Sequence, residues 1–137
     1  NPSDGTGVNL FVPSLSVHNS LDLDGDTLSY EFEVFADSSL SNPIAWSGLI
    51  AEQPSTTVWV VPSDLTENQI YFWRARSFDG ALSSEWMPTA SFLVNTANDA
   101  PGAPALVAPE DGRTLGTLLP ALTVGNAYDP DSDQLTY

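Results

Sequence analysis

A stretch of this chain recurs 107 residues further along. The segment PSLSVHNSLDLDGDTLSY, residues 13–30, returns as PALTVGNAYDPDSDQLTY, residues 120–137. Extended back to Pro2 and Pro109 without gaps, the register pairs 29 positions, of which 12 are identical. Repeats of roughly 20 to 50 residues cannot bury a core singly, whereas this period is that of a whole domain. We therefore expect one complete domain followed by the first quarter of another.

The charge of the chain narrows its possible partners. It has 18 Asp and Glu against three Arg and no Lys, a formal net charge of −15. Nucleic acid and anionic membranes both require a basic patch, so we expect neither as a partner, and cations are the natural ligands of such a surface. The chain has no Cys and therefore no disulfide or thiolate metal site, and no apolar run is long enough to insert in a membrane. An acidic, lysine-free chain with tandem units suggests an extracellular or cell-surface protein.

The hydrophobic pattern predicts an all-β fold. Short alternating segments are separated by Pro, Gly, Asn and Asp clusters, and no stretch has the 3.6-residue apolar period of a helix. About seven strands at this turn spacing indicate a sandwich. The predicted strands are 10–11 with 15–17, 28–36, 44–50, 56–61, 70–78 and 90–94.

Two of these strands show which side chains should face the core. Side chains alternate with period two, so Tyr30, Phe32 and Val34 should share one face of the strand 28–36. In the strand 70–78 the inward set is expected to be Tyr71, Trp73, Ala75 and Ser77, with Arg74 and Arg76 on the outer face.

The string LTENQIYFWRARSFDG, residues 65–80, resembles the corner and following strand of fibronectin type III domains. Leu65 stands six residues before Tyr71, and a later Trp86 also fits, whereas Val17 stands near the place of that family's usual Trp. The resemblance covers residues 2–94 and implies a seven-stranded antiparallel β-sandwich. It also implies that Tyr71 is a tyrosine corner, whose hydroxyl bonds to backbone a few residues upstream. Tandem units of this kind occur in bacterial surface proteins with similar acidic loops and Asn-Asp-Ala-Pro-like linkers.

The same resemblance makes the strands 28–36 and 70–78 antiparallel neighbours. Glu31 and Glu33 should then face Arg74 and Arg76 as cross-strand ion pairs. Exposed pairs contribute roughly 0.2 to 1 kcal/mol each, so their expected role is to fix the register.

The domain boundaries follow from the repeat and from proline. We expect a domain over residues 1–94, a Pro-rich linker over 95–109 and the first strands of an incomplete repeat over 110–137. Pro101, Pro104 and Pro109 favour an extended, semi-rigid linker that holds successive units apart.

A triad of aspartates offers the clearest candidate ligand site. Asp22, Asp24 and Asp26 alternate along one turn, and the repeat renews them as Asp129, Asp131 and Asp133. Carboxylates crowded in this way repel one another unless they share a cation, and Ca²⁺ is the expected one. The alternative is that Asp and Gly simply form a good turn with solvated carboxylates. Retention of the three Asp in two otherwise divergent copies favours calcium.

Two further groups could join these triads. In the related topology Asp79 lies at the same end of the sandwich as Asp22, Asp24 and Asp26. The linker residues Asn98 and Asp99 could approach the second triad and form an inter-domain calcium joint similar to that of cadherins.

The expected function is structural or adhesive rather than enzymatic. His18 is the single histidine, and its counterpart is Gly125, so no role common to both units can rest on it. Two alternatives remain: a subunit of an extracellular filament that donates strands from 115–137 to another copy, and a carbohydrate-binding module of a secreted hydrolase that stacks sugars on outward aromatics. The expected partners are neighbouring repeats or copies of the chain, with a glycan or surface-protein ligand as a further possibility. The number of repeats and the activity of the parent protein do not follow from these residues.

Overall fold

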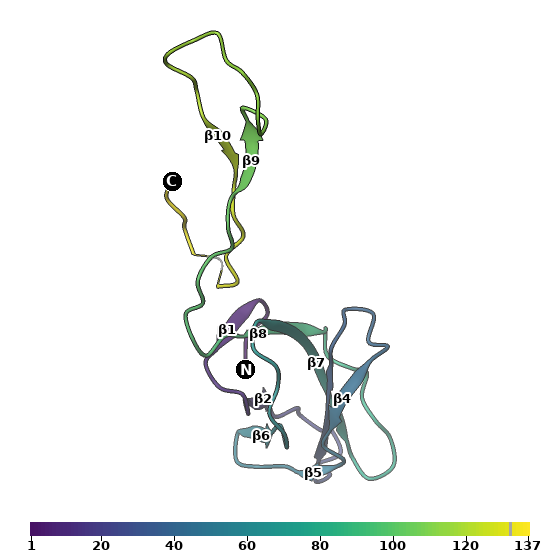
Figure 1. Ribbon diagram of the computed structural model, residues 1–137. Coiled ribbons are helices and arrows are strands. Elements are labelled where there is room, and N and C mark those ends of the chain that lie inside the picture. The colour runs from purple at the N-terminus through teal and green to yellow at the C-terminus, as the bar shows by residue number, and fades with distance from the viewer. Residues whose placement is uncertain (132) are drawn as a thin grey trace. The chain divides into compact units, whose positions relative to one another are not determined.

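The computed structural model describes residues 1–131 and 133–137, and all the regular structure in this part of the chain is β-strand. The chain divides into unit 1, Asn1–Ala97, and unit 2, Asn98–Tyr137. Figure 1 shows the strands of each unit. Unit 1 contains β1 (Thr6–Val8), β2 (Ser14–His18), β3 (Ser29–Phe35), β4 (Pro43–Trp46), β5 (Ile50–Ala51), β6 (Thr56–Val60), β7 (Gln69–Phe78) and β8 (Ala90–Val94).

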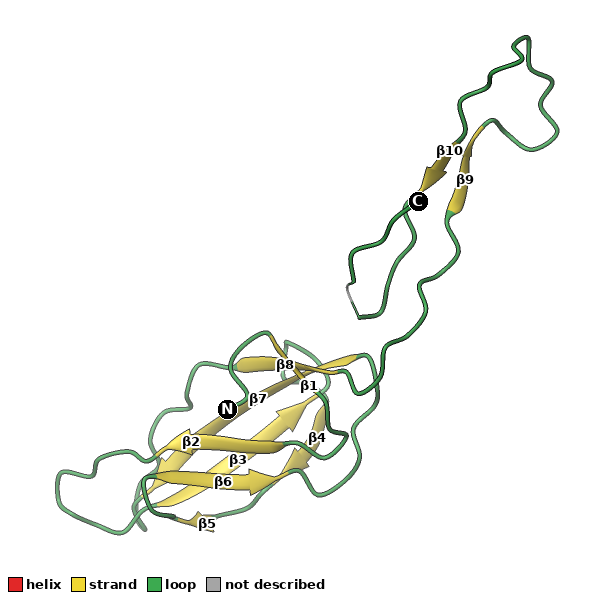
Figure 2. Ribbon diagram, turned by 90° about the vertical axis from the view of Figure 1, so that its left-hand side faces the viewer, coloured by secondary structure: helices red, strands yellow, loops and turns green. Residues whose placement is uncertain are grey.

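Unit 1 is built from two sheets that face each other. The larger sheet has the order β1-β8-β7-β3-β4, with β5 also paired to β3, and the smaller sheet is β2 with β6. Figure 2 shows the smaller sheet lying across β3 and β7 of the larger one. This arrangement is a β-sandwich, so the predicted all-β class is confirmed at that level.

The core lies between these sheets and contains the predicted inward faces of both long strands. Phe32 from β3 is fully buried, with ring centroids 6.1 Å from Trp59 of β6 and 6.3 Å from Trp73 of β7. Leu15 of β2 and Val94 of β8 are also fully buried. Each fully buried side chain of this size contributes about 1.5 to 3 kcal/mol.

The corner before β7 has the predicted arrangement. Leu65 and Tyr71 are both buried, and the Thr66 N–H donates a hydrogen bond of 2.9 Å to the Tyr71 hydroxyl. This bond ties the chain that enters β7 to the strand itself.

Two predicted strands differ from those observed. The N-terminal strand is Thr6–Val8 and not residues 10–11, because residues 6–8 are the ones that pair, in parallel, with β8. Leu10 and Phe11 lie outside the strand and are exposed. The predicted strand 44–50 is split into β4 and β5. Gly48 has a φ of +64° in the break, a backbone conformation that disrupts strand geometry. The β1–β8 pair also makes the larger sheet mixed, which corrects the expectation of purely antiparallel strands.

Unit 2 contains a hairpin-like pair, β9 (Ala105–Ala108) with β10 (Thr123–Gly125), joined antiparallel. β9 falls inside the predicted linker 95–109, so that segment is not extended linker throughout. The boundary between units lies at Ala97 and Asn98, slightly beyond the predicted domain end at Val94.

The tyrosine corner predicts a measurable loss of stability. Replacing Tyr71 by Phe keeps the buried ring but removes the acceptor of the Thr66 N–H. We expect the free energy of unfolding to fall by about 0.5 to 1.5 kcal/mol, as measured by urea denaturation. Tyr128 is 75% exposed, so Tyr128→Phe is the matched control and should leave the unfolding midpoint of unit 1 unchanged. Equal midpoints for Tyr71→Phe and wild type would contradict this role.

Candidate metal site

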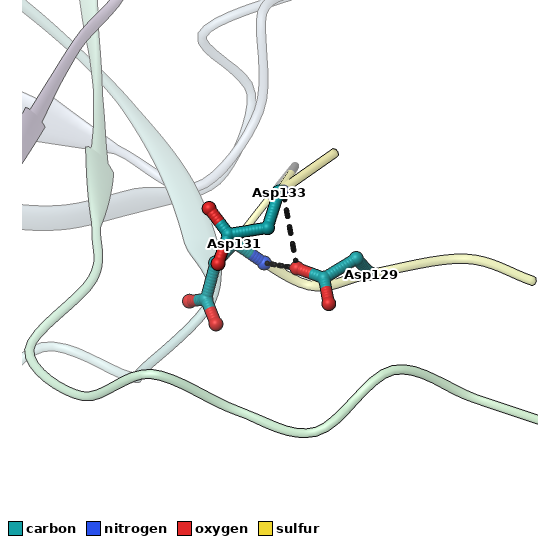
Figure 3. A group of neighbouring side chains, drawn as sticks. All are labelled: Asp129, Asp131 and Asp133. Carbon is teal, nitrogen blue, oxygen red and sulfur yellow. Dashed lines mark hydrogen bonds between the residues drawn. The ribbon is translucent and has the colours of Figure 1, made fainter. Parts of the chain in front are cut away.

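The acidic turn of unit 2 is shaped by its first aspartate. Asp129 Oδ1 accepts hydrogen bonds from the backbone N–H groups of Asp131 at 3.0 Å and Asp133 at 3.2 Å, as Figure 3 shows. An Asp side chain that bonds to backbone two residues on is a typical turn former. The turn therefore places all three carboxylates on one short loop.

These three carboxylates are close enough to share one ion. Asp129, Asp131 and Asp133 each offer an oxygen, and these oxygens lie within 4.8 Å of one another. Calcium binds oxygen at roughly 2.3 to 2.6 Å, so two oxygens on one ion lie up to about 5.2 Å apart. Asp129 is only 7% exposed, and Asp131 Oδ1 is buried without a hydrogen-bond partner. The residues present therefore fit a hard, oxygen-binding cation.

Residues predicted to belong to the linker also reach this turn. The Asp99 N–H donates a hydrogen bond of 2.6 Å to Asp131 Oδ2, and the Gly102 N–H donates one of 2.9 Å to the Tyr128 carbonyl. The predicted approach of Asp99 to the second triad is therefore present, and it lies wholly within unit 2.

The first acidic turn has the same two backbone hydrogen bonds as the second, but its carboxylates are not gathered around one point. Asp22 Oδ1 accepts the N–H of Asp24 at 2.9 Å and of Asp26 at 3.1 Å. Of the two Asp triads, both in the described part of the chain, the second is the one whose oxygens come within 4.8 Å of one another. Calcium at the first turn would require its side chains to rotate.

Asp79 lies beside the first turn but is engaged in its own loop. Its Oδ1 accepts the N–H groups of Leu82 and Ala81, both at 2.7 Å, and these bonds lower the pKa of its carboxyl. Asp22 and Asp79 line one open hollow of about 300 Å³. The structure thus brings Asp79 to the predicted end of the sandwich without adding it to the triad.

The outer face of the larger sheet contains the predicted ion pairs. β3 and β7 pair Glu31 with Arg76 and Glu33 with Arg74, and both ion pairs have a shortest distance of 2.7 Å. The Trp46 indole N–H also donates to Glu31, at 2.6 Å.

The sequence did not predict that an aromatic ring stacks on the two arginines of these ion pairs. The Trp86 ring has the Arg74 guanidinium at 4.2 Å from its centroid and the Arg76 guanidinium at 4.3 Å, and Arg74 also lies 5.4 Å from the Phe35 ring. The rings of Trp86 and Phe35 are therefore both in contact with guanidinium groups on this face.

Several carboxylates outside the triads accept hydrogen bonds from loop groups. Asp37 accepts from Ser39, Ser41 and Asn42, which lowers the pKa of its carboxyl to about 2, with the Ser39 hydroxyl as the largest cause. Glu67 accepts from the backbone N–H and hydroxyl of Thr96, which lowers the pKa of its carboxyl. Asp followed by Ser and Asn is a turn signal that could have identified the first of these.

No protein-family model, curated protein or solved structure matches this chain. Among the described residues, no helix has the length and apolar character to cross a membrane.

The stacked outer face predicts that Trp86 stabilises unit 1. Trp86→Leu keeps an apolar side chain but removes two cation–π contacts, so we expect the free energy of unfolding to fall by about 1 to 2 kcal/mol. Urea denaturation followed by circular dichroism measures this change. Leu82→Ala, at a side chain that is 73% exposed, is the control. If both variants lose the same small amount, the stacking contributes nothing.

The depressed pKa of Asp37 predicts a pH dependence of stability. Its folded-state pKa is about 2 against an ordinary 3.8, so the ionised form stabilises the fold above pH 4, and this contribution is lost as the pH falls toward 2. Asp37→Asn should lower the melting temperature at pH 7. Between pH 4 and pH 2 the melting temperature of this variant should decrease less than that of the wild type. Asp64→Asn, at another exposed aspartate, is the matched control for the loss of one carboxylate. An unaltered profile in Asp37→Asn would refute the assignment.

Proposed function

We propose that this chain is a structural, tandem-repeat segment of an extracellular or cell-surface protein, built of fibronectin type III-like units and stiffened by calcium. The proposed calcium ligands are Asp129, Asp131 and Asp133 in unit 2, with Asp22, Asp24 and Asp26 as the corresponding set in unit 1. The chain is not itself an enzyme in this proposal, and its partners are neighbouring repeats.

One observation carries the proposal: three carboxylate oxygens of the second turn lie within 4.8 Å of one another, and the most buried residue of the set is 7% exposed. Three carboxylates held at this distance repel one another strongly unless a cation neutralises them. A divalent ion with flexible oxygen coordination relieves that repulsion, and water or backbone carbonyls can complete its shell.

The position of this site supports a stiffening role. Thr96 and Ala97, at the end of unit 1, donate hydrogen bonds to Glu67. Asp99, in unit 2, donates to Asp131. Asn98 is the single residue between Ala97 and Asp99. A cation bound by Asp131 would therefore fix the position of Asp99, which directly follows this connection.

The resemblance to fibronectin type III domains is supported by particular contacts. Tyr71 bonds to backbone five residues upstream, Leu65 is buried in the same core cluster, and Phe32 of the larger sheet contacts Trp59 of the smaller one. A net charge of −15 without Lys or Cys is compatible with an extracellular setting, where calcium-binding modules typically have Kd values of about 10⁻⁴ to 10⁻³ M.

Calcium binding is testable on the full chain by isothermal titration and by thermal melting with EDTA. We expect binding in the range of about 10⁻⁴ to 10⁻³ M and a stabilisation of the calcium-bound form by about 2.7 kcal/mol at a hundredfold excess over Kd. Asp131→Asn should weaken binding at least tenfold. Asp111→Asn, an exposed aspartate of the same unit outside the triad, should not.

A first-turn variant separates the two sites. Asp24→Asn should remove one class of binding heat and leave that of unit 2 intact. No binding heat at 10 mM calcium, together with a melting temperature that EDTA does not change, would sink the proposal.

A further inference from the structure

The smaller sheet of unit 1 has an edge along each of its two strands, β2 and β6 (Figure 2). At the edge along β2, the Ser16 N–H donates to the Asn1 carbonyl at 2.7 Å, and the Asn1 amino group donates to the Ser16 carbonyl. Both backbone groups of Ser16 thus point away from β6. Ser16 is paired with Val58, so the two backbone groups of Val58 point away from β2, toward the outer edge of β6. Backbone groups in this position are a template for a further strand.

The side chain of Gln53 occupies this outer edge of β6. Its amide nitrogen donates to the Val58 carbonyl at 3.1 Å, and its amide oxygen accepts the Val58 N–H at 3.4 Å. A neighbouring antiparallel strand would form the same pair of bonds with the N–H and the carbonyl of one residue. The Gln53 amide therefore stands where a strand residue opposite Val58 would stand.

The backbone of Gln53 is fixed by two hydrogen bonds of its own. Its N–H donates to the Thr57 hydroxyl at 3.1 Å, and its carbonyl accepts a bond from the Asn19 side-chain amide. Thr57 is fully buried, so this anchor belongs to the core of unit 1. A group tethered at such short range has an effective concentration of about a millimolar, so Gln53 outcompetes a second chain at lower concentrations.

The edge that Gln53 occupies has the composition of a segment that pairs readily with itself. Residues 53–63, QPSTTVWVVPS, contain no charged side chain, in a chain that has 18 carboxylates. Thr, Val and Trp favour strands, and Val58 and Val60 are 37% and 53% exposed. Two copies with a net charge of −15 repel each other, but this segment has no charge to oppose their approach.

We infer that the Gln53 side chain is a built-in substitute for a neighbouring strand and keeps two copies of this chain from pairing through β6. The occupant that it excludes is the β6 strand of a second copy, antiparallel and centred on Val58. In that register Val58 lies opposite its own counterpart, and Thr56 lies opposite Val60. Each pair joins β-branched side chains, which are favourable cross-strand neighbours. The same edge serves both copies, so the pairing is symmetric and closes at two chains.

Gln53→Ala should open this edge. The variant keeps the backbone bonds to Thr57 and Asn19, so unit 1 should remain folded, which circular dichroism and urea denaturation check. Sedimentation equilibrium at increasing protein concentration should show self-association roughly tenfold stronger than that of the wild type, because both backbone groups of Val58 lose their partner. Gln69→Ala is the matched control. The Gln69 amide also donates to a backbone carbonyl, that of Ile70 in β7, and its loss should leave self-association unchanged.

A charge on the edge should reverse the effect. In Gln53→Ala with Val58→Glu, the new carboxylates of two paired copies lie directly opposite each other, so self-association should return to the wild-type level. Val12 is a loop residue with the same 37% exposure as Val58. In Gln53→Ala with Val12→Glu, the self-association of Gln53→Ala should therefore remain.

Hydrogen exchange tests the wild-type chain directly. The N–H groups of Val58 and Val60 both point to the outer edge of β6, and Gln53 binds the first of them. After correction for intrinsic rates, the Val58 N–H should exchange more slowly than the Val60 N–H. In Gln53→Ala at low protein concentration this difference should disappear.

The inference is overturned if the Val58 and Val60 N–H groups exchange alike in the wild type, or if Gln53→Ala self-associates no more strongly than the wild type. It is equally overturned if Val58→Glu leaves the self-association of Gln53→Ala in place, since the copies then meet at another surface.

Discussion

The contact of Phe32 in the larger sheet with Trp59 in the smaller one joins the two sheets of unit 1, and Trp73 stacks on Phe32 within the larger sheet; the rest of that unit depends on this cluster. All three rings belong to strands whose alternation is fixed once Phe32 faces inward. A slip of one residue in β3 would move Phe32 outward and bring a glutamate into the core. The ion pairs and the Trp86 stacking on the opposite face are therefore consequences of the core, because they form only in this register.

Period-two alternation accounts for the parts of the fold that could be predicted. It places Trp73 and Ala75 inside and Arg74 and Arg76 outside without knowledge of any other strand, and β8 has the predicted bounds. The parallel pairing of β1 with β8 could not be predicted, because it depends on partners more than 80 residues apart. The strand β9 was also missed, since its pairing with β10 outweighs the extended-linker signal of the neighbouring prolines.

The acidic residues show a second limit of sequence reasoning. Spacing of Asp at alternate positions is typical both of a cation loop and of an Asp turn, and both acidic turns here are Asp turns. The chain has only three Arg for 18 carboxylates, so most carboxylates have no arginine to pair with. Backbone N–H groups are the natural donors to these carboxylates, as they are at Asp37 and Glu67. What distinguishes the second triad is the position of its side chains and the Asp99 N–H that binds one of them. Neither follows from spacing alone.

The two copies of the repeat separate local from tertiary causes of structure. Hydrogen bonds from Asp129 and to Tyr137 persist in unit 2, although Leu122 and Tyr137 are largely exposed there. These hydrogen bonds are therefore present where Leu122 and Tyr137 are not buried, so the turns depend on local residues more than on the sandwich core. Burial of Leu15 and Tyr30 requires the opposite sheet, because nothing within the first 30 residues covers them in the second copy. The acidic turn of this repeat thus forms from local hydrogen bonds, whereas the core of unit 1 forms only where β3, β6 and β7 pack against β2.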